Sequence, residues 1–306
     1  MNILGTIGRT PLVPLRNLVP PGSARVLMKL ESANPTGSMK DRMALSMIEA
    51  AEADGRLRPG GAVVELTGGS TGTSLALVCA VKGFPLAIVT NDAISQEKRN
   101  HMKALGAALT VLPSHGAGLT DDLFRRMFEA TAALIEQTGA FWTNQFENPS
   151  QVAGYAPLGE EIWSQTEGRI DAFVHVVGTS GSIKGISTTL RAHKKGLRVI
   201  AVEPDSSSVL SGGAPGSHRI EGIGIGRVPP LWDRALADEI ETVSTDEAEA
   251  MARRLAREEA IFAGTSTGAN VIVALRVAER LGPEATVVTL AVDTGLKYLS
   301  TPLYRD

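Results

Sequence analysis

The feature that most constrains the fold is a regular alternation along the chain between short apolar runs and longer amphipathic segments. The apolar runs predict buried strands at residues 62–66, 86–90, 109–112, 172–177, 198–203 and 286–292. The segments between them predict helices at residues 73–82, 96–105, 121–138, 183–194, 247–259 and 269–281. Gly83 and Gly139 are expected to end two of these helices, and Ser244-x-x-Glu247 reads as a capping box that begins another. Strands and helices that alternate in this way predict an α/β fold with parallel sheets covered by helices on both faces.

The alternation is lost between residues 204 and 230, a stretch rich in Gly, Ser and Pro. A loop of this length without regular structure is often functional. No polar linker marks a domain boundary anywhere in the chain.

Composition limits the classes of partner. With 306 residues, 43% of them hydrophobic, the chain can bury a sizeable core. A net charge of −3 gives no general reason to expect nucleic acid or an anionic membrane as a partner. The single cysteine, Cys79, excludes an intramolecular disulfide or a cysteine metal cluster, and its apolar surroundings predict a buried structural thiol. No metal site is expected. With neither a signal peptide nor a membrane-length apolar run, the expected location is the cytoplasm.

Four turns rich in Gly, Ser and Thr lie where predicted strands give way to helices, at residues 34–40, 67–72, 178–182 and 264–268. In open α/β sheets, ligands bind at such turns. We therefore look for the functional residues here.

The first turn ends in Lys40, at the start of a predicted helix. The helix dipole disfavours a cation at this position and would lower the pKa of the lysine amine. A neutral amine is what a lysine needs in order to form a Schiff base with an aldehyde. On this segment alone, an ordinary solvated lysine is the better interpretation.

The other three turns could each bind an anion or a polar ring atom. Residues 178–182 are small and hydroxylated, and they precede a helix, an arrangement that suits a phosphate monoester. Residues 67–72 offer backbone and hydroxyl donors for a carboxylate. A hydroxyl in residues 264–268 could bond to a heterocyclic nitrogen. Taken singly, each turn is equally consistent with tight packing or with helix capping.

The order and spacing of matched segments across the chain are far more specific. The chain resembles the cysteine synthase (O-acetylserine sulfhydrylase) family of pyridoxal-5′-phosphate enzymes, which is related to the tryptophan synthase β chain. The first matches are Ile7-Gly8-Arg9-Thr10-Pro11-Leu12-Val13, similar to the family's I-G-x-T-P-L-V, and the segment from Asn34-Pro35 to Lys40-Asp41-Arg42. The later ones are Lys103-Ala104-Leu105-Gly106-Ala107, Gln145-Phe146-x-Asn148-Pro149, Gly159-x-Glu161-Ile162-Trp163, Val202-Glu203-Pro204, Ile220-x-Gly222-Ile223-Gly224 and Tyr298-Leu299-Ser300-Thr301. The matches run from residue 7 to residue 301, which is nearly the whole chain.

The resemblance implies a role for each of the four turns. Lys40 would hold pyridoxal phosphate as a Schiff base and act as the catalytic base. The cofactor phosphate would lie on Gly178, Thr179, Ser180, Gly181 and Ser182. Ser266 would bond to the pyridine nitrogen, and a serine there gives a weaker electron sink than an aspartate, which suits β-elimination better than transamination. The substrate carboxylate would be held by Thr67, Gly68, Gly69, Thr71 and Gln145.

The resemblance also implies the architecture and the reaction. We expect two open-sheet domains with the cofactor between them, a smaller one at residues 41–145 and a larger one formed by residues 1–40 and 146–306. The reaction is expected to be β-replacement on an activated serine, in which acetate, phosphate or water leaves. The alternatives are β-elimination, as in a serine or threonine dehydratase or a cystathionine β-synthase, and a non-catalytic pyridoxal phosphate carrier. Family members are usually homodimers, and whether a serine acetyltransferase partner exists stays open.

Two departures from the family bear on substrate choice. The family loop T-S-G-N-T-G reads Thr67-Gly68-Gly69-Ser70-Thr71-Gly72 here, so Ser70 takes the place of an asparagine that contacts the cofactor ring oxygen. Gly68 replaces a hydroxyl near the substrate carboxylate. Arg227 stands where the family has an aromatic residue, and it would either bind an anionic substrate or form a surface ion pair with Asp233 or Glu221.

Overall fold

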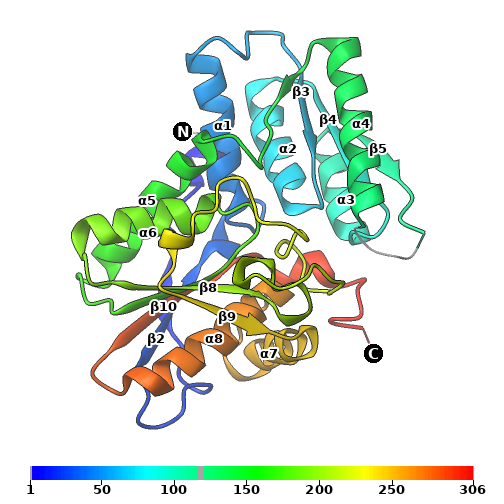
Figure 1. The fold of residues 1–306 in the computed structure, drawn as a ribbon. Helices are drawn as coiled ribbons and strands as arrows, with labels where there is room; N and C mark the ends of the chain where they lie inside the picture. Colours follow the sequence, from blue (N-terminus) through cyan, green and yellow to red (C-terminus); the bar gives the residue numbers. More distant parts are fainter. Residues whose placement is uncertain (1, 116–119, 306) are drawn as a thin grey trace.

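The computed structural model describes residues 2–115 and 120–305 and contains two sheets (Figure 1). The smaller sheet is parallel throughout, with the strand order β5 (Ala108–Leu112), β4 (Leu86–Asn91), β3 (Val63–Leu66) and β6 (Phe141–Trp142). The larger sheet has the order β1 (Leu12–Pro14), β2 (Arg25–Leu30), β10 (Thr286–Ala291), β7 (Ala172–Val176), β8 (Arg198–Pro204) and β9 (Glu239–Val243). The predicted α/β class is confirmed. The prediction of purely parallel sheets is wrong at one edge, because β1 pairs with β2 in the antiparallel direction.

Helices cover both faces of each sheet. They are α1 (Lys40–Ala53), α2 (Ser70–Lys82), α3 (Gln96–Ala104), α4 (Asp121–Thr138), α5 (Ser150–Gln165), α6 (Gly181–His193), α7 (Thr245–Glu258) and α8 (Thr265–Leu281). In the smaller sheet, Ile88 packs on the α2 side and its neighbour Val89 on the α4 side. In the larger sheet, Phe173 packs toward α5 and α6, and Val174 toward α7 and α8. Adjacent residues of a strand point to opposite faces of the sheet. A strand with helices packed on both faces therefore needs apolar residues at every position, and not apolar residues that alternate with polar ones.

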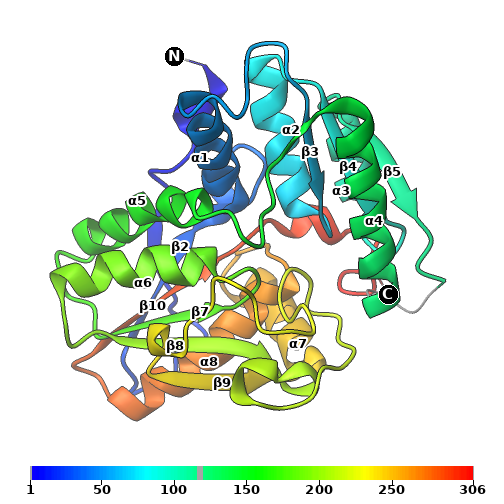
Figure 2. The same cartoon turned by 45° about the horizontal axis from the view of Figure 1, so that its top comes forward.

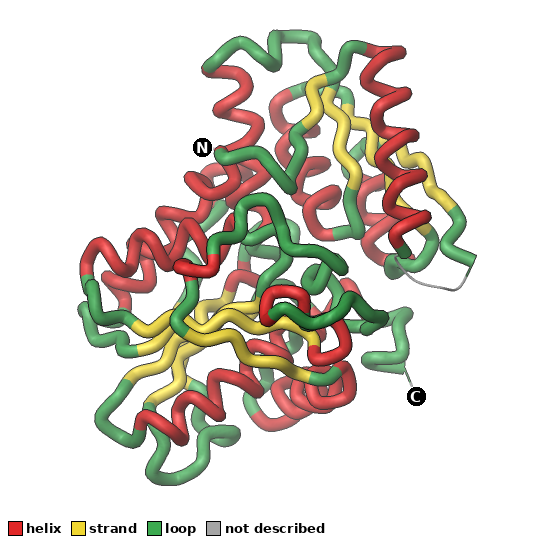
Figure 3. Tube along the Cα trace, viewed as in Figure 1, coloured by secondary structure: helices red, strands yellow, loops and turns green. Residues whose placement is uncertain are grey.

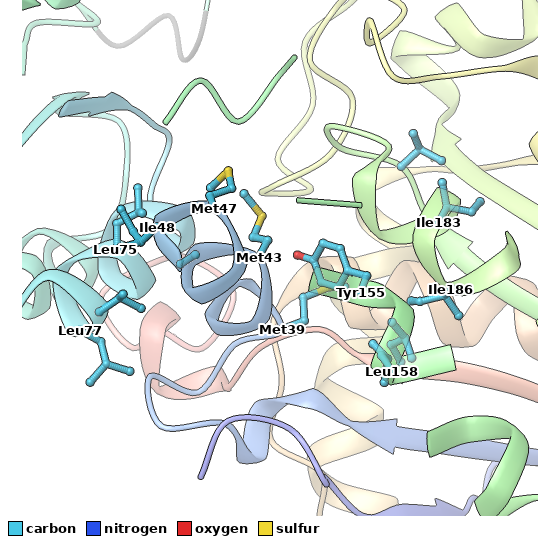
Figure 4. Packing of buried hydrophobic residues seen from close by; sticks show 14 of the residues in the cluster. Met39, Met43, Met47, Ile48, Leu75, Leu77, Tyr155, Leu158, Ile183 and Ile186 are labelled. Atoms are coloured by element: carbon cyan, nitrogen blue, oxygen red, sulfur yellow. The ribbon is translucent and has the colours of Figure 1, made fainter. Parts of the chain in front are cut away.

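Helix α1 lies where the two halves of the molecule meet. Figure 4 shows Met39, Met43 and Met47 between leucines of α2 on one side and side chains of α5 and α6, including Tyr155, on the other. One continuous apolar core therefore joins both halves around the helix that begins at Lys40. The strands of the smaller sheet all fall within the predicted domain 41–145, and the exact boundary stays a prediction.

Four of the six predicted helices begin two to four residues too late. Helices α2, α6, α7 and α8 begin at Ser70, Gly181, Thr245 and Thr265. Gly, Ser and Thr are weak helix formers in isolation, so their turns were predicted as loops. In the structure these residues form the first helical turn, where backbone N–H groups have no partner within the helix.

Strand β2 and helix α5 were not predicted, and both have a physical explanation. Arg25 and Lys29 interrupt the apolar run of β2. Helix α5 contains Pro157 and two glycines, residues that usually break helices. One of them, Gly154, allows close packing, because a Cβ atom there would lie 2.9 Å from the carbonyl oxygen of Arg42 in α1.

A buried charge cluster ties β2, α1 and α5 together behind the Lys40 turn. Lys29 Nζ lies 2.7 Å from Glu161 Oε2, and Arg42 bonds both Glu31 (2.7 Å) and Glu161 (2.8 Å). The side chains of Lys29 and Glu31 are fully buried. Charges this deep need paired partners, and these four residues supply them for one another.

The stretch 204–230 contains only short 3₁₀ turns, as predicted, and runs between the two sheets (Figure 3). Figure 2 shows it from a second direction, again close to the helices of the smaller sheet. Within the described part of the chain, no helix is long and apolar enough to cross a membrane. Cys79 is buried, and burial raises the pKa of its thiol to about 12, as expected for a structural residue.

Candidate functional site

The structure brings together the four turns that sequence analysis singled out. Met39 N donates to Val292 O (3.0 Å), and Ser38 pairs with Asp293, so the Lys40 turn joins the end of β10. Gly264 N donates to Asp293 O (3.3 Å), which adds the turn at residues 264–268. Gln151 accepts from Thr179 Oγ1 (2.7 Å), in the turn at residues 178–182, and donates to the carbonyl oxygen of Gln145. The side chain of Gln145 in turn accepts from Thr71, so these two glutamines connect the turns at residues 178–182 and 67–72.

Lys40 begins α1, as predicted. The side chain is partly accessible, yet protein atoms surround it closely, and this burial lowers the pKa of its amine to about 8. The negative charge of Asp293 acts in the opposite direction. The predicted lowering of the pKa is therefore present, with burial as its main cause. At a pKa near 8 the amine is available in its neutral form close to neutral pH.

The turn at residues 178–182 has the properties of a phosphate cradle. Glycine is required at two positions: a Cβ atom on Gly178 would lie 2.5 Å from Gly222 O, and one on Gly181 would lie 2.3 Å from Gln151 Oε1. Ser180 has a φ of 69° and is 1% exposed, and its hydroxyl has no hydrogen-bond partner among the described residues. An unpartnered buried hydroxyl at the N-terminus of α6 fits the phosphate of pyridoxal phosphate.

Gln145 is held against the turn at residues 67–72 by buried hydrogen bonds. Thr71 Oγ1 donates to Gln145 Oε1 (2.7 Å), and Gln145 Nε2 donates to Leu66 O (2.9 Å). Glu65 accepts from the backbone N–H of Gln145, and burial raises the pKa of Glu65 to about 7 against the effect of its hydrogen bonds. Gly69 has a φ of 138°, which favours glycine, while a Cβ atom on Gly68 would meet no atom within 4 Å. The turn at residues 67–72 thus lies against Gln145, with open space at Gly68, and its binding of a carboxylate stays a prediction.

Ser266 lies in the first turn of α8 and is 2% exposed. Its two neighbours bond to backbone: Thr265 Oγ1 accepts from Glu221 N (3.1 Å), and Thr267 Oγ1 accepts from Val292 N (3.0 Å). No hydrogen bond is found for the Ser266 hydroxyl within the described part of the chain. Ser266 is therefore the one of the three whose hydroxyl makes no bond to the described part of the protein, as the predicted contact with a ring nitrogen requires.

Asp293 is a site residue that sequence analysis missed. It is 3% exposed, and its Oδ2 accepts from Tyr298 Oη (2.8 Å) and Ser70 Oγ (3.2 Å). Its Oδ1 is buried without a partner among the described residues. No local pattern marks Asp293, because it lies just beyond the last predicted strand and outside the four turns. The expected contact of Ser70 with the cofactor stays a prediction, since its hydroxyl already donates to Asp293.

Replacing Ser70 by asparagine is expected to preserve cofactor binding and to change the ratio of kcat/KM between serine donors by roughly three- to tenfold. The amide offers two donors where the hydroxyl offers one, and one hydrogen bond contributes about 0.5–1.5 kcal/mol. Steady-state kinetics with O-acetylserine and O-phosphoserine measure the ratio. Ser70→Ala is the control for simple loss of the bond to Asp293. An unchanged ratio in Ser70→Asn would mean that this departure from the family does not affect substrate choice.

Arg227 stacks on the aromatic rings of Phe124, in α4, and Phe146. Its guanidinium carbon lies 4.1 Å from the ring centroid of Phe124 and 5.7 Å from that of Phe146. No ion pair of Arg227 with Asp233 or Glu221 is found among the described residues, where Glu221 pairs with Lys98 and Asp233 accepts from Ala235 N. Arg227 borders a cavity of about 470 Å³, also lined by Phe124, Arg125, Phe128 and Gly226. Its role in binding an anionic substrate stays a prediction.

Replacing Arg227 by phenylalanine is expected to lower kcat/KM for O-phosphoserine by roughly one to two decades and to spare O-acetylserine. A charge-assisted contact with phosphate contributes about 1.5–3 kcal/mol, and a phenyl ring can keep the contact with Phe124. Arg125→Ala is the matched control, since Arg125 lines the same cavity but pairs with Asp122 and Glu129. Equal losses for both donors would show that Arg227 holds the loop and does not recognise charge.

Sequence analysis also missed two residues, Gln151 and Lys98, that connect segments around the site. Gln151 lies in the unpredicted helix α5, so nothing in the pattern marked it. Lys98 in α3 is 2% exposed, pairs with Glu221, and places its Nζ 4.2 Å from the ring centroid of Tyr298. Most other residues of α3 are polar, so nothing in the sequence distinguishes the buried Lys98 from the exposed polar residues around it.

Comparisons with known proteins agree with this geometry. A family model described as "Pyridoxal-phosphate dependent enzyme" matches residues 3–293. A cysteine synthase of Staphylococcus aureus is 43% identical over 305 residues, which cover 99% of this chain and 96% of the relative. The crystal structure of a cysteine synthase from Entamoeba histolytica superimposes with a TM-score of 0.93 at 38% identity, over 100% of this chain and 91% of the other. An O-ureido-L-serine synthase superimposes with a TM-score of 0.92 at 39% identity, over 99% and 94%.

Proposed function

The chain belongs to the family of pyridoxal-phosphate-dependent enzymes, and we propose that it catalyses β-replacement on an activated serine with Lys40 as the cofactor-binding base. In such a reaction a leaving group departs from the β-carbon and a nucleophile, sulfide in a cysteine synthase, takes its place. Lys40, whose pKa is about 8, lies at the end of β10, and the turn at residues 178–182 follows the neighbouring strand β7. This arrangement carries the proposal, because the turn contains a buried Ser180 hydroxyl that has no partner among the described residues.

Each turn has a defined task in this mechanism. Pyridoxal phosphate, when bound, would withdraw electrons from the substrate α-carbon and so acidify its proton. Residues 178–182 would hold the phosphate, and Ser266 would bond to the ring nitrogen. Thr67, Gly69, Thr71 and Gln145, with the open space at Gly68, would hold the substrate carboxylate and fix the α-carbon in front of Lys40.

Lys40 would move the proton. Its amine would accept the α-proton as the leaving group departs, and would return a proton to the α-carbon after the nucleophile has added to the β-carbon. A base acts best when its pKa lies near the working pH, and a value of about 8 suits this task. Because the Ser266 hydroxyl does not hold the ring nitrogen protonated, loss of a β-substituent is favoured over transamination.

A panel of donors tests the proposed function. The holoenzyme is mixed with sulfide and with O-acetylserine, O-phosphoserine or serine, and cysteine and pyruvate are measured. Replacement predicts cysteine in proportion to the sulfide consumed. Pyruvate without sulfide consumption would indicate β-elimination instead, and a coloured protein without either product would indicate a non-catalytic carrier. The names of relatives, which include an O-ureido-L-serine synthase, make other nucleophiles worth adding to the panel.

Three expectations from the sequence complete the proposal. They are a homodimer, a cytoplasmic location, and a division into a smaller domain at residues 41–145 and a larger one formed by the rest. Sedimentation of the holoenzyme tests the first of them directly.

A further inference from the structure

His175 is a buried histidine for which the mechanism above has no use. It lies on β7 in the interior of the larger sheet and is 1% exposed. Its Nε2 lies 2.9 Å from Ser182 Oγ, in the first turn of α6. Ser182 is one of the five residues at 178–182 that we propose to hold the cofactor phosphate. His175 therefore contacts this turn directly, from strand β7.

The imidazole ring of His175 is neutral near neutral pH. Burial, and then the positive charge of Lys40, lower the pKa of His175 to about 3. A neutral imidazole has one N–H donor and one bare nitrogen that accepts. The position of the proton therefore decides which way the bond to Ser182 runs.

The surroundings of the second ring nitrogen indicate the tautomer. His175 Nδ1 is buried without a partner among the residues described. A buried N–H without an acceptor is rarer in proteins than a buried acceptor without a donor. The proton is accordingly assigned to Nε2, which then donates to Ser182 Oγ and leaves the Ser182 O–H to point elsewhere.

We propose that His175 is a positioning residue of the cofactor site, which fills an acceptor position of Ser182 Oγ and thereby directs the Ser182 O–H toward a phosphate oxygen. This inference rests on the proposed function, since it requires a phosphate on the turn at residues 178–182. Together with the Ser180 hydroxyl, which has no partner among the residues that the structure describes, it gives the turn two hydroxyl donors for the anion. In the opposite tautomer, Ser182 would donate to His175 and could not donate to phosphate.

The test compares the affinities of the full-length protein for pyridoxal phosphate and for pyridoxal, which lacks the phosphate. His175→Phe is expected to raise the dissociation constant of pyridoxal phosphate by roughly three- to tenfold, the effect of one hydrogen bond. The affinity for pyridoxal should not change. In a Ser182→Ala background the same substitution should have no further effect, because the residue through which His175 acts is gone. His193→Phe is the matched control, since His193 lies on the far end of α6 and pairs with Glu160.

The outcomes separate this inference from the proposed function. Wild-type protein that binds pyridoxal phosphate no better than pyridoxal would contradict both. Normal binding by wild type with an equal loss of both ligands in His175→Phe, or with no loss, would overturn the role of His175 alone. ¹⁵N NMR of the wild-type holoenzyme gives a check that needs no variant: the account expects a proton on Nε2, and a proton on Nδ1 overturns it.

Discussion

Replacing Lys40 by alanine is expected to lower kcat for β-replacement by at least roughly a thousandfold while the protein stays folded. The variant loses the base that moves the α-proton, and a positioned base contributes about 10²–10⁴ in rate. It also loses the amine that holds the cofactor covalently. Steady-state turnover of the best donor in the panel, with circular dichroism to confirm folding, measures the effect.

Lys103→Ala is the control for this prediction. Lys103 is an exposed lysine of α3 with no part in the site, so its removal should leave turnover unchanged. If Lys40→Ala kept more than a tenth of wild-type turnover, the proton would have to be moved by another group.

Replacing Arg42 by methionine is expected to lower the free energy of unfolding by about 3–5 kcal/mol, the usual cost of removing one partner from a buried ion pair. Glu31, whose side chain is fully buried, would lose both of its bonds from Arg42. Urea denaturation measures the change. Arg254→Ala is the matched control, because its pair with Glu258 is exposed and should contribute less than about 1 kcal/mol.

The same cluster predicts how stability depends on pH. Burial opposes the charged form of Glu161, but hydrogen bonds and charges from Arg42 and Lys29 outweigh it and hold the pKa of Glu161 at about 2, below its ordinary value of 4.5. The unfolded chain therefore binds more protons in this range, and the contribution of Glu161 is complete above pH 4.5 and lost as the pH falls toward 2. The slope of stability against pH between these values should become shallower in Arg42→Met. An unchanged slope would mean that Arg42 does not hold Glu161 ionised.

The sequence pattern predicted the helices and strands whose own residues favour the structure that they adopt in the fold. Helix α4 was predicted with its observed ends because Thr120 caps its start and Gly139 its end. Helix α5 was missed because it contains Pro157 and two glycines, and the need for these glycines in close packing against α1 and α6 is visible only in the assembled structure. Strand β2 was missed because Lys29 is paired with Glu161, far away in the sequence.

The same division holds for the site. Lys40, Ser266 and the turns at 67–72 and 178–182 lie at strand–helix junctions, where ligands bind in open α/β sheets. Their individual roles were predicted from the resemblance to the family, since local composition alone did not decide them. Asp293 and His175 act through contacts with Ser70 and Ser182, and no local pattern distinguishes them. Arg227 was recognised as unusual, but its stacking on Phe124 depends on how the two halves meet.

The covalent attachment of the cofactor tests the central claim most directly. The holoenzyme is reduced with borohydride and digested, and the peptides are mapped by mass spectrometry. The account predicts a pyridoxyl group on Lys40 alone. Modification of Lys82, Lys103, Lys184 or the buried Lys297 in place of Lys40, or of no lysine at all, would contradict it.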